Sequence, residues 1–315
     1  MNERFAAEPT TCDSANDLKH LLEKFGPVTG RYLAAFPVSN WESLLRNHIE
    51  PWKDVERAKA LLWLRRATEA RALISAGGSR YEERDTWVRN VVRAQESASR
   101  FDGVVVSRTS AGAFPSIDEL ELPPTSEERV AATWKEYARV SGVLLRDSTE
   151  LHFIDPYFNP CNADRQVVLR EMLRIAGAGR CQAAYVWLNE NYVKRSQTEM
   201  VAALRTIAIE AGFVSPRHSL HLRDFTDAGR DVKVHDRYLL SLYGSVRFEY
   251  GFQQLTGKKR ADVSPVGSIR HLLLLEQFHE GKNDLEVESF LVDTQKPPSL
   301  TCSADTARRP RTAHS

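Results

Sequence analysis

The chain has 315 residues, of which 42% are hydrophobic and 27% charged, a composition typical of a globular protein with a substantial core. Its 43 basic and 42 acidic side chains nearly cancel, so no overall field favours nucleic acid or a membrane surface, and any polyanion site must be local. No apolar run approaches the roughly 18 residues that span a bilayer, and the first residues lack the apolar block of a secretory signal. We therefore expect a cytoplasmic protein without a transmembrane segment.

The cysteines and histidines give no sign of a metal site. No C-x-x-C pair occurs among the four cysteines, which are Cys12, Cys161, Cys181 and Cys302. This spacing predicts free thiols rather than a zinc site or a disulfide framework. His218 and His221 are three residues apart in a strand-like segment, so they should point to opposite faces. We expect neither a metal nor another cofactor.

The first half of the chain is predicted to alternate strands and helices. Residues 1–25 are polar and then weakly helical, and we expect a flexible N-terminus there. An α/β region should follow over residues 26–108, with strands at 30–38, 70–78 and 101–108 and helices at 52–67 and 81–98. Residues 109–126 are rich in Ser, Pro and acidic side chains, which predicts a linker or an exposed loop.

The second half has a clearer order. Thr125-x-x-Glu128 is a capping-box pattern, which predicts a helix that begins there and continues through Val130 and Trp134. Strand-like segments at 151–158, 182–188 and 219–225 then alternate with helical segments at 163–179 and 196–212. The expected fold is α/β, with a mixed, largely parallel sheet flanked by helices over residues 127–293, and with a ligand crevice at the carboxyl ends of the strands. Residues 294–315 lack any apolar period, so we expect a disordered tail.

The segment Asp231–Phe252, DVKVHDRYLLSLYGSVRFEYGF, contains the main candidate site. If it begins as a strand, His235 and Arg237 project to one face and Asp236 to the other. An imidazole beside a guanidinium suits a phosphate, since one can attack phosphorus and the other can bind two oxygens at once. Glu249 or Asp155 could accept from the ring and fix its tautomer. The alternative is a structural histidine at a strand start, with Glu249 an exposed charge and Asp155 a turn residue.

These residues resemble a known family. VHDRYLLSLYGSVRFEYGF, together with the earlier IDPYF, resembles a divergent half of the phospholipase D-like superfamily, in its His-[Asp/Asn]-Arg branch. The resemblance implies a phospholipase D-like module at residues 127–293 and a bacterial setting of phage defence or mobile elements. Arg237 replaces the usual lysine, Leu242 stands where an acid is expected, and the Gly-Ser-x-Asn turn is incomplete. Only one motif is present, whereas active members bring two together, so activity would require a homodimer with two facing His235 residues.

Two functions follow from the resemblance. The first is a module that recognises nucleic acid or another phosphodiester without turning it over. The second is a metal-independent phosphodiesterase or nuclease that acts through a phosphohistidine at His235, with Arg237 and Glu249 in its catalytic group. The candidate phosphate-binding residues are Asp155, Tyr157, Ser245, Gln253, Lys258 and Lys259. For the two lysines, a solvated basic loop is the competing interpretation.

Overall fold

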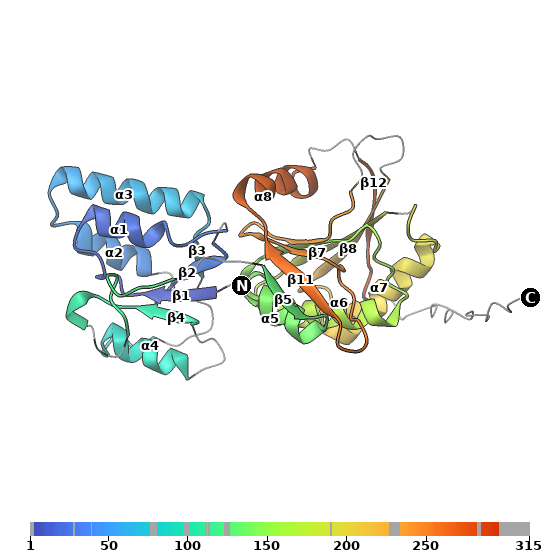
Figure 1. Ribbon diagram of the computed structural model, residues 1–315, viewed down its shortest axis with the longest axis horizontal. Coiled ribbons are helices and arrows are strands. Elements are labelled where there is room, and N and C mark those ends of the chain that lie inside the picture. The colour runs from blue at the N-terminus through green and yellow to red at the C-terminus, as the bar shows by residue number, and fades with distance from the viewer. Residues whose placement is uncertain are drawn as a thin grey trace, which may run out of the picture.

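The computed structural model describes residues 3–27, 29–38, 40–75, 81–96, 101–110, 112, 114–122, 127–189, 191–226, 234–281 and 285–295. They form two α/β units, one from each half of the chain, that lie side by side along the long axis (Figure 1). Each unit has its own sheet, one of four strands and one of eight. The expected α/β class, with a mixed sheet flanked by helices, is confirmed.

The N-terminal unit is built on a sheet of four parallel strands in the order β3-β2-β1-β4. The strands are β1 (Glu3–Ala7), β2 (Arg31–Ala35), β3 (Leu73–Ser75) and β4 (Gly103–Val105). The expected flexibility of residues 1–25 is wrong for the part that the structure describes, because β1 is an inner strand paired on both sides. Its five residues are too few to show a period, and only the pairing with β2 and β4 makes it recognisable as a strand.

Helices cover both faces of this sheet. Figure 1 shows α1, α2 and α3 on one face and α4 on the other. Their bounds are α1 (Ala15–Leu22), α2 (Trp41–Ile49), α3 (Asp54–Glu69) and α4 (Trp87–Gln95), and a short 3₁₀ turn, η1, follows β4 at Arg108–Ser110. Ser14 caps α1 by accepting from the backbone N–H of Asp17, which places the start of the helix directly after the loop from β1.

The C-terminal unit is built on a mixed sheet of eight strands in the order β12-β8-β7-β6-β9-β10-β11-β5. The strands β6, β7 and β8 run parallel, and every other neighbouring pair is antiparallel. The strands are β5 (Glu128–Ala131), β6 (Glu150–Ile154), β7 (Ala183–Asn189), β8 (Ser219–Thr226), β9 (Tyr238–Leu240), β10 (Ser245–Phe248), β11 (Arg260–Pro265) and β12 (Glu286–Leu291).

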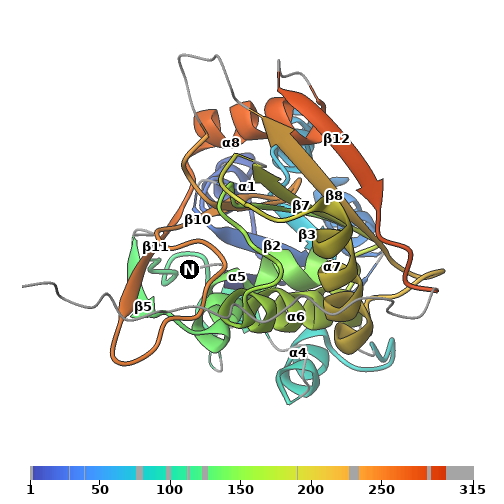
Figure 2. The ribbon, with the colours of Figure 1, turned by 90° about the vertical axis from the view of Figure 1, so that its right-hand side faces the viewer.

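Three helices pack on one face of this sheet, and a fourth lies over the other face (Figure 2). They are α5 (Trp134–Asp147), α6 (Ala163–Ala178), α7 (Gln197–Ala211) and α8 (Ser268–Leu274), which continues as a π-helical turn, η2, at Leu275–His279. Helix α7 begins at a reciprocal capping box between Ser196 and Glu199 and ends at Gly212, whose φ of 69° is left-handed. These local signals explain why the helix was predictable.

The start of the helix predicted from Thr125-x-x-Glu128 is wrong, whereas its later part, from Trp134 onward, is helical. Glu128–Ala131 is the edge strand β5, which pairs with β11, and Thr125 lies outside the described residues. The helix begins later, at Trp134, where Thr133 accepts from the N–H of Glu136. The Thr-x-x-Glu spacing occurs twice, at Thr125 and at Thr133. The second copy caps the helix, because Glu128 of the first copy lies in strand β5.

The two units share a core. One hydrophobic cluster contains buried residues of both sheets, among them Tyr32 of β2 and Val246 of β10. Tyr32 also donates a hydrogen bond of 3.1 Å to the carbonyl of Tyr243, and Arg71 donates one of 2.6 Å to the carbonyl of Leu242. The turn between β9 and β10 is therefore held by side chains of the N-terminal unit.

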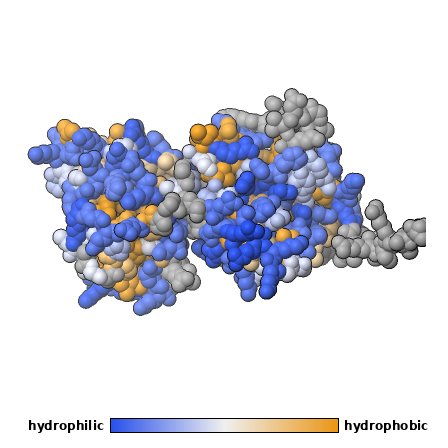
Figure 3. Space-filling view, in the orientation of Figure 1, coloured by the Kyte–Doolittle hydropathy of each residue, from blue (hydrophilic) through white to orange (hydrophobic). Residues whose placement is uncertain are grey.

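Helix α8 exposes apolar side chains. Ile269, Leu272 and Leu273 are exposed, and Figure 3 shows hydrophobic colour over this helix. Within the described ranges, no helix has the length and apolar character needed to cross a membrane. Cys12 and Cys181 are free and buried, as expected, whereas Cys161 is disulfide-bonded, so the expectation of free thiols is wrong for that cysteine. Cys302 and the expected disordered tail from residue 296 onward lie outside the described residues, as do residues 123–126 of the expected linker.

Candidate functional site

The candidate site lies where several strands of the C-terminal sheet end or begin. The carboxyl ends of the parallel strands β6, β7 and β8 share one edge. Because β9 is antiparallel to β6 and pairs Tyr238 with Ile154, the chain enters β9 at that same edge. The end of β10 lies beside it, since Arg247 pairs with Tyr238. Segments 155–158, 191–193, 234–237 and 249–253 therefore meet there, as the crevice rule for parallel strands predicts.

His235 is exposed and lies against two tyrosines. Its Nδ1 is 2.6 Å from the hydroxyl of Tyr157, and the two ring planes are nearly parallel at 13°. The ring of Tyr192, from the segment after β7, lies 4.7 Å from that of Tyr157 and 6.3 Å from that of His235, between ring centres. The phenol therefore occupies one ring nitrogen of His235.

Arg237 lies on the same tyrosine. Its guanidinium carbon is 4.7 Å from the centre of the Tyr157 ring, within the range of a cation–π contact. Nη1 donates to the backbone carbonyl of Glu249 at 3.1 Å, and Nε is 4.0 Å from Oδ1 of Asp155. With 30% of the side chain exposed, Arg237 is held in place and still open to solvent.

The predicted strand start is displaced, although the two residues still lie together. β9 begins at Tyr238, so His235 and Arg237 are in the segment just before it. Both contact Tyr157, which replaces a shared strand face as the reason for their proximity. Asp236 points elsewhere, as expected, and accepts from the hydroxyl of Tyr238 at 2.6 Å.

Asp155 is the buried anchor of the site. It is 1% exposed, and its carboxylate accepts from the backbone N–H groups of Tyr157 and Phe252. Burial raises the pKa of the Asp155 carboxyl, while the guanidinium of Arg165, 3.4 Å away, acts to lower it. Four donors or cations thus stabilise its ionised form. A Cβ at Gly251, whose φ is 65°, would collide with this carboxylate, so the loop approaches Asp155 closely because Gly251 has no side chain.

Arg165 adds a second cation to the site. It lies in the first turn of α6 and donates to Oε1 of Gln253 at 3.3 Å as well as contacting Asp155. Two guanidinium groups, Arg165 and Arg237, therefore lie beside a single buried carboxylate.

Some of the predicted site residues are placed at this edge in other roles. Asp155 is too deeply buried to bind a phosphate directly and instead positions the arginines. Tyr157 and Gln253 do lie in the site. The carboxylate of Glu249 accepts from the backbone N–H of Asp262 at 3.0 Å and does not orient the imidazole, whose partner is Tyr157. Glu249 contributes only its backbone carbonyl, to Arg237.

The remaining predicted residues are not brought to His235. Ser245 is at the opposite end of the β9–β10 hairpin, where it pairs with Leu240, and its buried hydroxyl is 2.7 Å from Nδ1 of His271. Lys258 and Lys259 are exposed just before β11, and none of the contacts described for this part of the chain joins them to His235. The interpretation of a solvated basic loop therefore gains support.

Sequence reasoning did not find Tyr192 and Arg165. Tyr192 follows β7 at the same sheet edge as Tyr157, so the crevice rule applied to every parallel strand would have included it. Arg165 is three residues after Asn162, the cap of α6, and no local pattern distinguishes it from the other arginines of that helix.

One described group of side chains has the spacing of a metal site, and it lies elsewhere. Glu150, His152 and His279 offer three ligand atoms within 4.8 Å of one another. Glu150 starts β6, at the opposite end of that strand from Asp155. The candidate phosphate site and this cluster are therefore separate.

Comparisons with known proteins leave the family open. No family model matches the chain, and no curated protein matches it. Among solved structures, the chain is similar to the archaeal chromatin protein TrmBL2, whose structure is described as showing a novel mode of DNA binding. The match has 14% sequence identity and a TM-score of 0.30, over 79% of this chain and 71% of that one. At this level the likeness carries no argument about fold or function.

Proposed function

We propose that the C-terminal unit is a phospholipase D-like module that recognises a phosphodiester, such as a nucleic-acid backbone, at the edge formed by His235 and Arg237. The observation that carries the proposal is the position of these two side chains on one tyrosine, over a buried carboxylate that holds two guanidiniums. Arg237 would bind the anionic oxygens and His235 would donate from its exposed ring nitrogen. The proposed setting is a bacterial conflict or mobile-element system, which rests on the motif alone.

The partner of His235 favours binding over turnover. A carboxylate only accepts, so it would hold the proton on Nδ1 and leave a lone pair on Nε2 for attack. The hydroxyl of Tyr157 can donate or accept, and it therefore does not fix the tautomer that a nucleophile needs. With Glu249 turned toward Asp262, no carboxylate of the described residues takes that role.

The binding proposal is tested with a fluorescein-labelled single-stranded oligonucleotide as a phosphodiester probe. Arg237→Gln should weaken binding about tenfold or more at a fixed salt concentration, because charge-assisted hydrogen bonds to phosphate are lost. Arg174→Gln is the matched control, since it removes the same charge from an exposed site on α6. Equal affinities for the wild type and Arg237→Gln would contradict the proposal. Vesicles that contain a phosphoinositide, used in the same comparison, distinguish a lipid headgroup from a nucleic acid.

The enzymatic alternative has its own test. Hydrolysis of bis-p-nitrophenyl phosphate in the presence of EDTA, by the wild type and by His235→Ala, detects a metal-independent phosphodiesterase. Activity that resists the chelator and disappears in the variant would establish catalysis. The molecular mass in solution decides whether the homodimer that this mechanism requires exists, because a strict monomer has a single His235 and no second histidine to protonate the leaving oxygen.

A further inference from the structure

A second site lies on the face of the large sheet that α8 covers. His152 of β6, Tyr185 of β7 and His221 of β8 are register partners, and their rings stack with centres 4.8 Å apart in both pairs. One step along the strands, Trp187 pairs with Arg223. His152, Tyr185, Trp187 and Arg223, together with the end of the π-helical turn at His279, line a cavity of about 350 Å³, which is large enough for a small ligand.

Arg223 is a half-buried cation, and the ionised carboxylate that shares its cavity, that of Glu150, is hydrogen-bonded to two histidine rings. The Arg223 guanidinium lies 5.2 Å from the ring centre of Tyr185 and 5.9 Å from that of Trp187. Its Nε is buried and has no hydrogen-bond partner, and no carboxylate within the described ranges forms an ion pair with it. Withdrawing a cation from water is costly unless an anion compensates, so the geometry calls for an anionic group beside Arg223.

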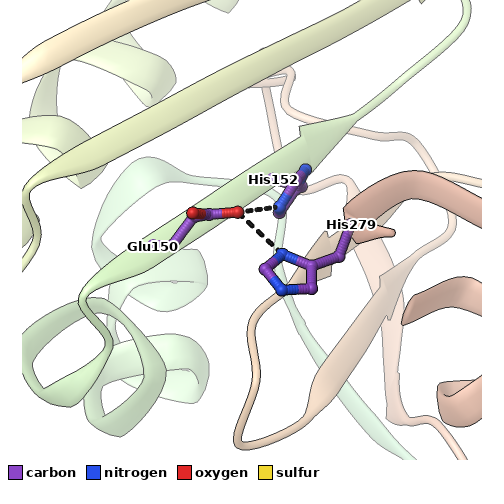
Figure 4. Close-up of side chains that lie close together, drawn as sticks. All are labelled: Glu150, His152 and His279. Atoms are coloured by element: carbon purple, nitrogen blue, oxygen red, sulfur yellow. Dashed lines mark hydrogen bonds and ion pairs between the residues drawn. The ribbon is translucent and has the colours of Figure 1, made fainter. Parts of the chain in front are cut away.

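The second feature of the cavity is the hydrogen-bonded group Glu150, His152 and His279 (Figure 4). Oε1 of Glu150 is 2.8 Å from Nε2 of His152 and 2.8 Å from Nδ1 of His279. These distances would suit a metal ion as well as hydrogen bonds. The choice depends on which nitrogen of each ring carries the proton.

Trp187 decides this for His152. Its indole Nε1–H, which can only donate, lies 3.1 Å from Nδ1 of His152, so Nδ1 accepts and the proton of the neutral ring is on Nε2. Burial lowers the pKa of His152, which favours the neutral ring. A metal-ligating histidine normally donates from its other nitrogen, whereas here that nitrogen accepts. His152 is thus a hydrogen-bond donor to Glu150 and is not suited to ligate a metal.

The orientation of His279 follows from Glu150. The hydrogen bonds from His152 and His279 lower the pKa of the Glu150 carboxyl, so it is an ionised acceptor that draws the proton of His279 to Nδ1. The lone pair of His279 is then on Nε2. Since His279 lines the cavity and is 28% exposed, it offers a proton acceptor to a ligand there. Glu280, an exposed residue, also lines the cavity.

We propose that this cavity binds a small oxyanion that also carries an O–H group, as a protonated phosphate does. Arg223 binds the anionic oxygens and Nε2 of His279 accepts from the hydroxyl. Sulfate has the same shape as phosphate but carries no proton at neutral pH. Its oxygen and Nε2 of His279 would both be acceptors, and no hydrogen bond could form between them. The two ions therefore separate the contribution of His279 from that of Arg223.

The tautomers are tested first, on the wild-type protein. Long-range ¹H–¹⁵N spectra of the histidine rings should show His152 protonated on Nε2 and His279 on Nδ1. Zinc chloride added alone should leave the ring nitrogens of His152 unshifted. Coordination of zinc by His152, or the opposite tautomer of either ring, would overturn the proposal.

Binding is tested by titrating inorganic phosphate and sulfate while following the indole signal of Trp187, assigned with Trp187→Phe. Phosphate should bind saturably and at least about tenfold more tightly than sulfate, because sulfate leaves the acceptor nitrogen of His279 without a hydrogen-bond donor. Arg223→Gln should abolish the shift of the Trp187 signal. His279→Gln should reduce the ratio of the affinities for phosphate and sulfate toward one. Arg174→Gln, the control, should behave as the wild type does. Arg223→Lys keeps the charge but loses the paired hydrogen bonds of the guanidinium, so it should weaken binding. It replaces Arg223→Gln in the test if that variant does not fold.

Three outcomes would contradict the second site. They are the absence of a saturable shift of Trp187, equal affinities for the two ions, and binding that Arg237→Gln abolishes. The last outcome would assign the phosphate to the site at His235 instead, so the proposal for this cavity can fail while the proposed function stands.

Discussion

The hydroxyl of Tyr157 lies 2.6 Å from Nδ1 of His235, although the two residues are 78 positions apart in the chain. The contact joins the carboxyl end of β6 to the entry of β9. It also brings His235 to the ring that supports Arg237, so one tyrosine organises both proposed ligand-binding groups. Tyr157 therefore contacts both His235 and Arg237, and the geometry of the site depends on it as well as on Asp155.

Removing this hydroxyl should weaken ligand binding moderately. In Tyr157→Phe the ring beneath Arg237 remains, while the hydrogen bond to His235 is lost. A net loss of about 1 kcal/mol, or roughly fivefold in affinity, is expected in the oligonucleotide assay. Tyr81→Phe removes a tyrosine hydroxyl in the N-terminal unit and is the control. An unchanged affinity for Tyr157→Phe would show that the imidazole is not held by the phenol.

Replacing the buried anchor should affect stability rather than binding alone. Asp155→Asn leaves Arg165 without its carboxylate, and breaking a buried pair in this way costs about 3–5 kcal/mol. The free energy of unfolding, measured in urea, should fall by that order. Asp54→Asn breaks a surface pair with Arg57 from a side chain that is 92% exposed, and it should change stability by less than about 0.5 kcal/mol. Similar values for the two variants would refute the anchoring role of Asp155.

His271 should make the protein sensitive to mild acid. Burial, with a smaller effect of Arg71, lowers its pKa from 6.5 to about 4 in the folded state. The unfolded chain therefore binds a proton at a higher pH than the folded one. The stabilising contribution is present above the unfolded value and is lost as the pH falls from about 6.5 to about 4, by up to about 3 kcal/mol.

The variant His271→Gln isolates this contribution. Glutamine can still pair with Ser245 but does not titrate, so unfolding free energies measured at several pH values should decline less steeply in the variant over this window. His152 and the paired carboxylates titrate in both proteins and cancel in the difference. Parallel curves for the two proteins would mean that His271 does not contribute.

The contact between the two units can be tested at Gly244. A Cβ there would lie 2.5 Å from the hydroxyl of Tyr32, so Gly244→Ala should destabilise the fold by about 1–3 kcal/mol. Tyr32→Phe removes the clashing oxygen and also its bond to Tyr243, at a cost of about 1 kcal/mol. The double variant should therefore lose less stability than the sum of the single changes. Strict additivity would show that the two residues do not meet.

The sequence predicted the elements whose signals are local. The alternation of strand and helix from β6 to β8 was correct, because helices such as α7 carry caps, an apolar period and a terminal glycine. Strand β1 was predicted to be part of a flexible N-terminus, and strand β5 was predicted to be the start of a helix. Each is only four or five residues long, and its identity depends on partners far along the chain, β2 and β11.

The site divides in the same way. The position of His235 and Arg237 could be predicted, because both belong to one short motif and the order of strands puts that motif at the carboxyl edge of the parallel strands. Their partners could not be predicted, since the contacts that define the site join residues such as Arg165 and Gln253 across 88 positions. The cluster at Glu150 depends on His279, which lies 129 positions further along the chain, on a π-helical turn that no local pattern announces.

The central claim is that His235 and Arg237 bind one anion together, and a double-variant cycle of binding tests it most directly. Affinities for the labelled oligonucleotide are measured for the wild type, His235→Ala, Arg237→Gln and the double variant at one salt concentration. We predict that the double variant binds about as weakly as Arg237→Gln alone, with a coupling of about 1 kcal/mol or more. Fully additive losses, or no loss in either single variant, would contradict the account.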